Sequence, residues 1–145
     1  MDVDGTLISK DDEVRPYISE LMRGLNERGC SITVWSAGGE NYAESKWNMI
    51  CNKIFYSTGE QLHDMVSHFS WKLNWESRAL IGKHFYIDDE PAILSVAQRS
   101  GYGTHQVSFY EPILMKDDHE LLDALEAARR FFNDGFTSTN AREIA

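Results

Sequence analysis

The sequence predicts an α/β fold in which helices cover both faces of a mostly parallel sheet, with no separate cap domain. Segments with the period of amphipathic helices alternate with short segments rich in β-branched and aromatic residues along nearly the whole chain. This alternation is typical of parallel sheets built from strand–helix–strand units. Acidic or hydroxyl side chains also follow two of the expected strands and a third strand-like position at the start of the chain, at the end of the sheet where such folds bind ligands.

The size and charge of the chain favour one folded domain without a nucleic-acid surface. The chain has 145 residues, 42% of them hydrophobic, and carries a formal net charge of −9. A chain of this length can bury a sizeable core without disulfides. The acidic balance argues against an extended surface that neutralises nucleic-acid phosphates. We place the domain at residues 1–133 and expect a loose polar tail over residues 134–145.

The first third of the chain reads as helix, strand and helix. A helix is predicted from about residue 16, with Gly29 at the position that ends it in the left-handed conformation. Residues 30–35 then read as a buried strand. Ser36 to Gly39 break this strand. The second helix carries an apolar stripe made of Ala43, Trp47, Ile50 and Cys51.

The middle third is less regular. Residues 54–56 are a short strand candidate, and residues 62–69 have the spacing of an amphipathic helix. Between residues 69 and 75, aromatic and aliphatic side chains alternate with polar ones, which fits a strand. The same stretch fits equally well an aromatic-rich loop that leads into a short helix.

In the last third of the chain, strand-like and helix-like segments again alternate clearly. Residues 84–87 predict a strand that ends in two acids, and Pro91 suits the first position of the helix that follows. Residues 105–109 predict one more strand. A final amphipathic helix is expected from about residue 117 to residue 132.

The two cysteines point to a reducing compartment. Cys30 and Cys51 form no CxxC pair, and this argues against both a disulfide framework and a structural zinc site. We expect both to be buried as small apolar residues in a cytoplasmic protein. We expect no leader peptide, and no apolar run approaches the roughly 20 residues that a membrane span requires.

Three motifs carry the chemistry. The run Asp-Val-Asp-Gly-Thr begins at Asp2, a hydrophobic strand ends at Ser36, and another ends at Asp88 and Asp89. In this order they resemble the motifs of the haloacid dehalogenase (HAD) superfamily. The resemblance implies a three-layer Rossmann-like fold and a Mg²⁺-dependent phosphatase that hydrolyses phosphomonoesters through an aspartyl phosphate.

The resemblance also implies roles for individual residues. Asp2 would be the nucleophile, and Asp4 would be the general acid and base. Ser36 and the amide of Ala37 would bind the phosphoryl group. The metal would be held by Asp2, the backbone carbonyl of Asp4, Asp88 and Asp89. Hard carboxylate and carbonyl oxygens suit Mg²⁺, and a carboxylate that attacks a phosphate needs a cation between the two anions.

The family's lysine motif has no distinctive local pattern, so four lysines compete for it. Lys46 comes too early in the chain, Lys53 precedes the short strand candidate, and Lys83 starts its strand at the wrong end. Lys72 lies before the segment that leads into the strand ending at Asp88. We therefore predict that Lys72 binds the phosphate and pairs with Asp2.

In one respect the chain departs from the family pattern. The first motif of the family closes a hydrophobic strand at the centre of the sheet, but here only Met1 precedes Asp2. We expect that strand to lie upstream of this chain, unless the protein builds its core differently.

Other readings of the motifs remain open at this stage. The short gaps between motifs leave no room for a large cap, so the site should be open to a phosphorylated small molecule or to an exposed phosphate on a macromolecule. The alternatives are a receiver-like module that holds phospho-aspartate and a catalytically inactive HAD scaffold. Taken singly, Ser36 and the acid pair at Asp88 would read as helix-capping residues, and the first motif is a poor calcium loop.

Overall fold

The computed structural model describes residues 1–72, 83–133 and 142–144, and it shows an α/β fold. Within these ranges the helices are α1 (Ile18–Glu27), α2 (Glu40–Thr58), the short 3-10 helix η1 (His63–Met65), α3 (Pro91–Arg99) and α4 (Glu120–Asn133). The strands are β1 (Ser31–Ser36), β2 (His68–Trp71), β3 (Lys83–Asp88), β4 (Gly103–Gln106) and β5 (Arg142–Ile144). None of the described helices has the length and apolar character needed to cross a membrane.

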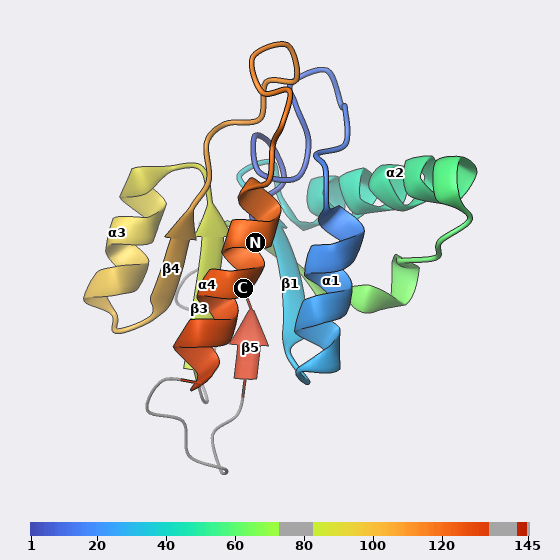
Figure 1. The fold of residues 1–145 in the computed structure, drawn as a ribbon. Helices are drawn as coiled ribbons and strands as arrows, with labels where there is room; N and C mark the ends of the chain where they lie inside the picture. The colour runs from blue at the N-terminus through green and yellow to red at the C-terminus, as the bar shows by residue number, and fades with distance from the viewer. Residues whose placement is uncertain (73–82, 134–141, 145) are drawn as a thin grey trace.

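The strands pair in the order β2-β1-β5-β3-β4, and each pairing is parallel (Figure 1). In the outer pairs, Val34 lies beside Phe69 and Tyr86 lies beside Thr104. Parallel pairing brings the carboxyl ends of β1 and β3 to the same end of the strands. The loops that follow these strands therefore meet there.

Both ends of the described chain lie between β1 and β3. Ile144 of β5 pairs with Ile32 on one side and with Phe85 on the other. One residue further along β1, the Met1 ammonium donates a hydrogen bond to the Thr33 carbonyl oxygen at 2.6 Å. The central position expected for a strand before the first motif is thus occupied by β5, with the first residues of the chain following it in the same direction.

Backbone hydrogen bonds then anchor the first motif in this central position. The Trp35 amide donates to the Met1 carbonyl at 2.9 Å, and the Asp2 amide donates to the Ile87 carbonyl at 3.0 Å. Asp2 therefore bridges β1 and β3 near their carboxyl ends. The prediction of a loose tail over residues 134–145 is wrong for Arg142–Ile144, which form β5, while residues 134–141 and 145 lie outside the described residues.

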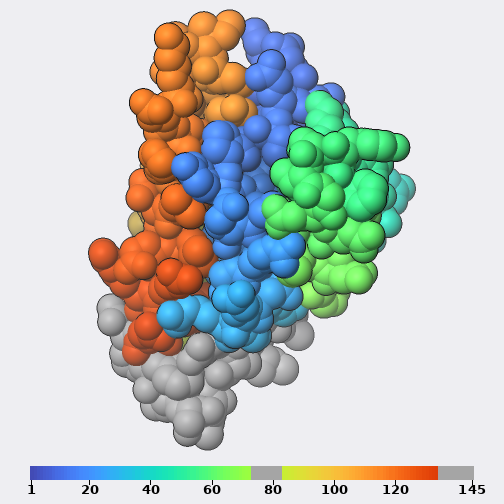
Figure 2. Space-filling model, turned by 45° about the vertical axis from the view of Figure 1, so that its right-hand side comes forward, coloured from blue at the N-terminus to red at the C-terminus, as the bar shows by residue number. Residues whose placement is uncertain are grey.

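The apolar core lies on both sides of the strands. Ile32, Val34, Phe85 and Ile87 belong to a large buried cluster with α1, α2 and α4, whereas Trp35 and Tyr86 pack with α3. This division follows from the alternation of side chains along a strand. The space-filling view shows the N-terminal segment between α2 and the C-terminal helix, which is where the large cluster forms (Figure 2).

Most of the expected elements are present, the strand expected over residues 105–109 lies instead at Gly103–Gln106, and two further local predictions are wrong. Residues 54–56 continue α2, because Ile54 extends the buried stripe of Trp47, Ile50 and Cys51 by one more turn. The helix expected over residues 62–69 is replaced by η1 and the start of β2. In the ambiguous stretch of residues 69–75, β2 ends at Trp71, and residues 73–75 lie outside the described residues.

The position of β5 leads to a stability prediction. Ile144→Pro removes a backbone donor from a strand that has neighbours on both sides, where proline is not tolerated. We expect a loss of about 1–3 kcal/mol in the free energy of unfolding, measured by urea denaturation. Ile144→Val keeps the backbone donor and serves as the control. Equal stability of the proline variant and the control would show that β5 does not pair in solution.

Candidate active site

Three segments far apart in the sequence meet at the carboxyl ends of β1 and β3. Asp2 lies between these strands, Asp88 is the last residue of β3, and Lys72 follows directly after β2. All three side chains are buried. Burial of three charged groups in one place is costly unless the charges are paired with one another, which is what their contacts show.

The Lys72 ammonium joins the two buried carboxylates. Its Nζ lies 3.2 Å from Oδ1 of Asp2 and 2.8 Å from Oδ2 of Asp88. Glu90, at the start of α3, is farther away, with its carboxylate 3.8 Å from the same Nζ. The second oxygen of Asp88 accepts the Glu90 backbone amide at 2.9 Å. The predicted contact between Lys72 and Asp2 is therefore present, and the binding of phosphate by Lys72 remains a prediction.

The electrostatics of this cluster are unfavourable to an ionised Asp2. Burial raises the pKa of Asp2 to about 9, and the hydrogen bond with Asp89 and the charge of Asp88 act in the same direction, while Lys72 opposes them. Burial also raises the pKa of Asp88, against the effect of Lys72. For Lys72, burial lowers the pKa, but the neighbouring carboxylates outweigh it and the pKa is raised. The Lys72 ammonium offsets the effect of burial only in part, so a further cation would help to keep these carboxylates ionised.

Three of the acids are arranged so that they could hold that cation. Asp2, Asp88 and Asp89 each offer an oxygen, and these oxygens lie within 4.8 Å of one another. An all-oxygen set of this kind suits a hard divalent ion such as Mg²⁺. The side chain of Asp4 is not one of these three, and its Oδ1 accepts a hydrogen bond from the Tyr42 hydroxyl at 3.0 Å.

Ser36 ends β1 beside this cluster. Its Oγ accepts the Gly38 amide at 3.0 Å, and its carbonyl oxygen accepts the Lys72 amide at 2.9 Å. The turn that contains Ser36 and the exposed Ala37 is therefore tied to the backbone of Lys72. The role of Ser36 and Ala37 in binding phosphate remains a prediction.

The other candidate lysines lie elsewhere. Lys46 pairs with the Asp12 carboxylate at 2.9 Å, and Lys53 donates to the Asp12 carbonyl at 2.7 Å, so both bind the loop after the first motif. At the far end of β3, the Nζ of Lys83 lies 5.4 Å from the centroid of the Phe131 ring.

Sequence reasoning assigned no role to Thr6, although Thr6 belongs to the first motif. Its hydroxyl lies 3.2 Å from Oδ2 of Asp2 and 3.4 Å from Oδ1 of Asp89, close enough to donate its single proton to either. Because the side chain is fully buried, this hydroxyl restricts the orientation of both carboxylates. Its position within the first motif was the sequence feature that could have predicted a role for Thr6.

Arg15 stabilises the loop that carries the first motif. No local pattern in the sequence predicts this role. Its guanidinium donates to the carbonyls of Gly5, Thr6 and Ser108 at 3.1, 3.3 and 2.9 Å. It also forms ion pairs with Asp118 at 2.7 Å and Glu120 at 2.8 Å. The side chain is buried, and these partners come from segments about a hundred positions away, so only the folded chain reveals the network.

Phe109 packs over the first motif at Gly5. A Cβ built on Gly5 would lie 2.4 Å from Cδ2 of Phe109 and 3.0 Å from a carboxylate oxygen of Asp89, and the φ angle of Gly5 is +81°. Any other residue would therefore clash and be strained. Phe109 is 43% exposed, so it leaves an apolar surface beside the acids.

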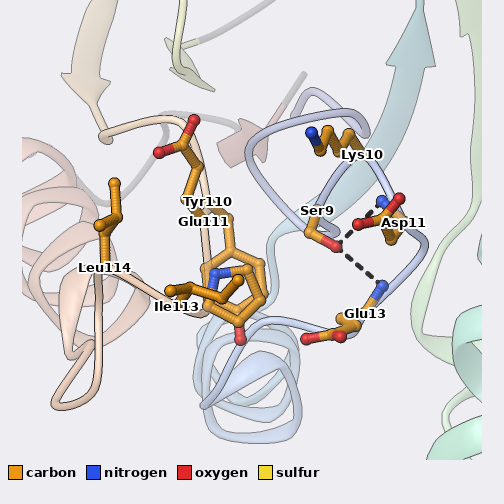
Figure 3. Close-up of a pocket in the computed structure, with 9 residues that line it drawn as sticks. Ser9, Lys10, Asp11, Glu13, Tyr110, Glu111, Ile113 and Leu114 are labelled. Atoms are coloured by element: carbon orange, nitrogen blue, oxygen red, sulfur yellow. Dashed lines mark hydrogen bonds between the residues drawn. The ribbon is translucent and has the colours of Figure 1, made fainter.

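A pocket of about 290 Å³ lies between the loop after the first motif and the loop after β4. Figure 3 shows Ser9, which accepts the amides of Asp11 and Glu13 on one side, facing Tyr110 and Ile113 on the other. None of the carboxylates of the candidate site lines this pocket. The pocket is therefore a neighbour of the site and not part of it.

Comparison of the chain with family models, with curated proteins and with solved structures gives no match.

The Arg15 network leads to a stability prediction. Arg15→Ala leaves Asp118 buried without its partner and frees three carbonyls, so we expect a loss of about 3–5 kcal/mol in the free energy of unfolding, measured by urea denaturation. Arg23→Ala is the control, because Arg23 pairs with Glu60 at the surface, where such pairs contribute under about 1 kcal/mol. Similar losses in the two variants would contradict the role assigned to Arg15.

Proposed function

We propose that this protein is a Mg²⁺-dependent phosphatase of the HAD type, which hydrolyses phosphomonoesters through an aspartyl phosphate on Asp2. The observation that carries the proposal is the Lys72 ammonium, held between the carboxylates of Asp2 and Asp88 with Asp89 close by. The order of the strands and the placement of helices against them support a three-layer Rossmann-like domain for this chemistry.

The acids at the site fit the proposed metal. Asp2, Asp88 and Asp89 supply hard oxygen donors, and a bound cation would favour the ionised form of Asp2, whose pKa is raised chiefly by burial. The Asp4 carbonyl would complete the protein ligands, as the resemblance implies. When bound, Mg²⁺ would neutralise the charge that develops on the phosphoryl oxygens.

Different side chains act in the two chemical steps of the proposed reaction. Asp2 attacks phosphorus while Asp4 protonates the leaving oxygen, and Asp4 next takes a proton from the water that hydrolyses the aspartyl phosphate. Lys72 holds the Asp2 carboxylate in place and balances the charge of the phosphoryl group. Ser36 and the Ala37 amide would bind the phosphoryl oxygens from the turn after β1.

The substrate would be a phosphorylated small molecule or an exposed phosphate on a macromolecule. Phe109 leaves apolar surface beside the acids, which suits a leaving group with an aromatic or aliphatic part. An assay for metal-dependent turnover separates this proposal from an inactive scaffold and from a receiver-like module, neither of which would release phosphate repeatedly.

The first functional prediction concerns the nucleophile. Asp2→Asn keeps the shape of the side chain but removes the anion, so we expect it to abolish Mg²⁺-dependent hydrolysis of p-nitrophenyl phosphate. Asp64→Asn, at an exposed position in η1, is the matched control. Residual activity of Asp2→Asn within about tenfold of the wild type, which is only about 1.4 kcal/mol of barrier, would exclude Asp2 as the nucleophile.

The second functional prediction compares two lysines. Lys72→Ala removes the cation between Asp2 and Asp88, and we expect kcat to fall on the order of 10²–10³-fold, as for the loss of one oxyanion donor. Lys83→Ala, at the opposite end of β3, should stay close to wild type. Thermal unfolding of both variants verifies that they are folded. Equal loss of activity in the two folded variants would refute the role of Lys72.

A further inference from the structure

We infer that Tyr42 is a positioning residue for Asp4, an inference that rests on the proposed function. Tyr42 lies in the first turn of α2, and its hydroxyl donates a hydrogen bond to Oδ1 of Asp4 at 3.0 Å. The general acid and base of the proposed reaction is therefore oriented by a side chain that does not touch the reacting atoms.

The Tyr42 ring is itself held in place from two sides. A Cβ built on Gly38 would lie 2.9 Å from Cγ of this ring, so the ring packs directly against the turn that follows Ser36. On another side, the Nζ of Lys46 lies 5.4 Å from the ring centroid and is anchored by its ion pair with Asp12. The hydroxyl is thus presented to Asp4 from a fixed ring.

This hydrogen bond distinguishes the two oxygens of Asp4. A phenol donates its one proton, so Oδ1 is occupied as an acceptor. In the part of the chain that the structure describes, no hydrogen bond to Oδ2 of Asp4 is seen. Oδ2 is then the oxygen that carries the transferable proton. This proton passes to the leaving oxygen as the bond from Asp2 to phosphorus forms and the ester P–O bond breaks.

If Asp4 donates a proton to the leaving group, the effect of Tyr42→Phe on kcat should depend on the acidity of that group. Hydrolysis of an alkyl phosphate needs the proton from Asp4, whereas p-nitrophenolate leaves with little assistance. Tyr42→Phe keeps the ring against Gly38 and removes only the hydroxyl. We expect it to lower kcat about tenfold for an alkyl phosphate such as glycerol phosphate and less than about threefold for p-nitrophenyl phosphate, with KM nearly unchanged, as the loss of one hydrogen bond implies.

Two further variants separate positioning from a purely structural effect. Tyr56→Phe, at a position that is 87% exposed in the same helix, should leave both substrates unaffected. In an Asp4→Asn background, Tyr42→Phe should cause no additional preference between the two substrates. The melting temperatures of Tyr42→Phe, Asp4→Asn and the double variant should show coupling between the two side chains.

The outcomes separate this inference from the proposed function. An active wild type with equal losses on both substrates in Tyr42→Phe, or additive melting-temperature changes, would overturn the inference and leave the phosphatase proposal standing. A wild type with no Mg²⁺-dependent turnover of either substrate would overturn the proposed function and this inference with it. A selective loss on the alkyl phosphate, together with coupled melting temperatures, would support both.

Discussion

The contact of the Lys72 ammonium with the carboxylates of Asp2 and Asp88 is the constraint on which the rest of this structure depends. Three buried charges are tolerable only when they lie close together, because each would lose its hydration without compensation. Their closeness depends on the parallel pairing of β1 with β2, which brings Lys72 to the end of β1, and on the position of Asp2 between β1 and β3. Both ends of the described chain lie between these two strands, where backbone hydrogen bonds anchor Met1 and Asp2.

A second layer of contacts keeps the loop of the first motif rigid. Arg15 binds its carbonyls, the Thr6 hydroxyl faces the carboxylates of Asp2 and Asp89, and the ring of Phe109 packs over Gly5. Tyr42 then fixes the Asp4 side chain from α2. A site that transfers protons and phosphoryl groups needs this degree of placement, since small errors in geometry cost large factors in rate. The loops can therefore carry the chemistry although they contain little regular structure.

Local patterns predicted most elements because they record which side of a helix or strand is buried. They failed where two patterns compete over a few residues. Ile54 fits a short strand as well as the next turn of α2, and the helix wins because it buries Ile54 below Ile50 and Cys51. For β5, the polar residues before Arg142 gave no strand signal, and its place between β1 and β3 follows from pairing with distant segments.

The order of the motifs and the chemistry of their side chains were readable from the chain alone: two acids at the start, a serine after one strand and two acids after another. Because parallel strands end at the same edge, this pattern predicted that Asp2, Ser36, Asp88 and Asp89 lie together, and the motif order of the family that the chain resembles favoured Lys72 among the lysines. The partners of Arg15, the contact of Tyr42 with Asp4 and the central place of β5 were not readable in this way. These depend on which surfaces meet after folding, and contacts between residues tens of positions apart leave no local period or spacing in the sequence.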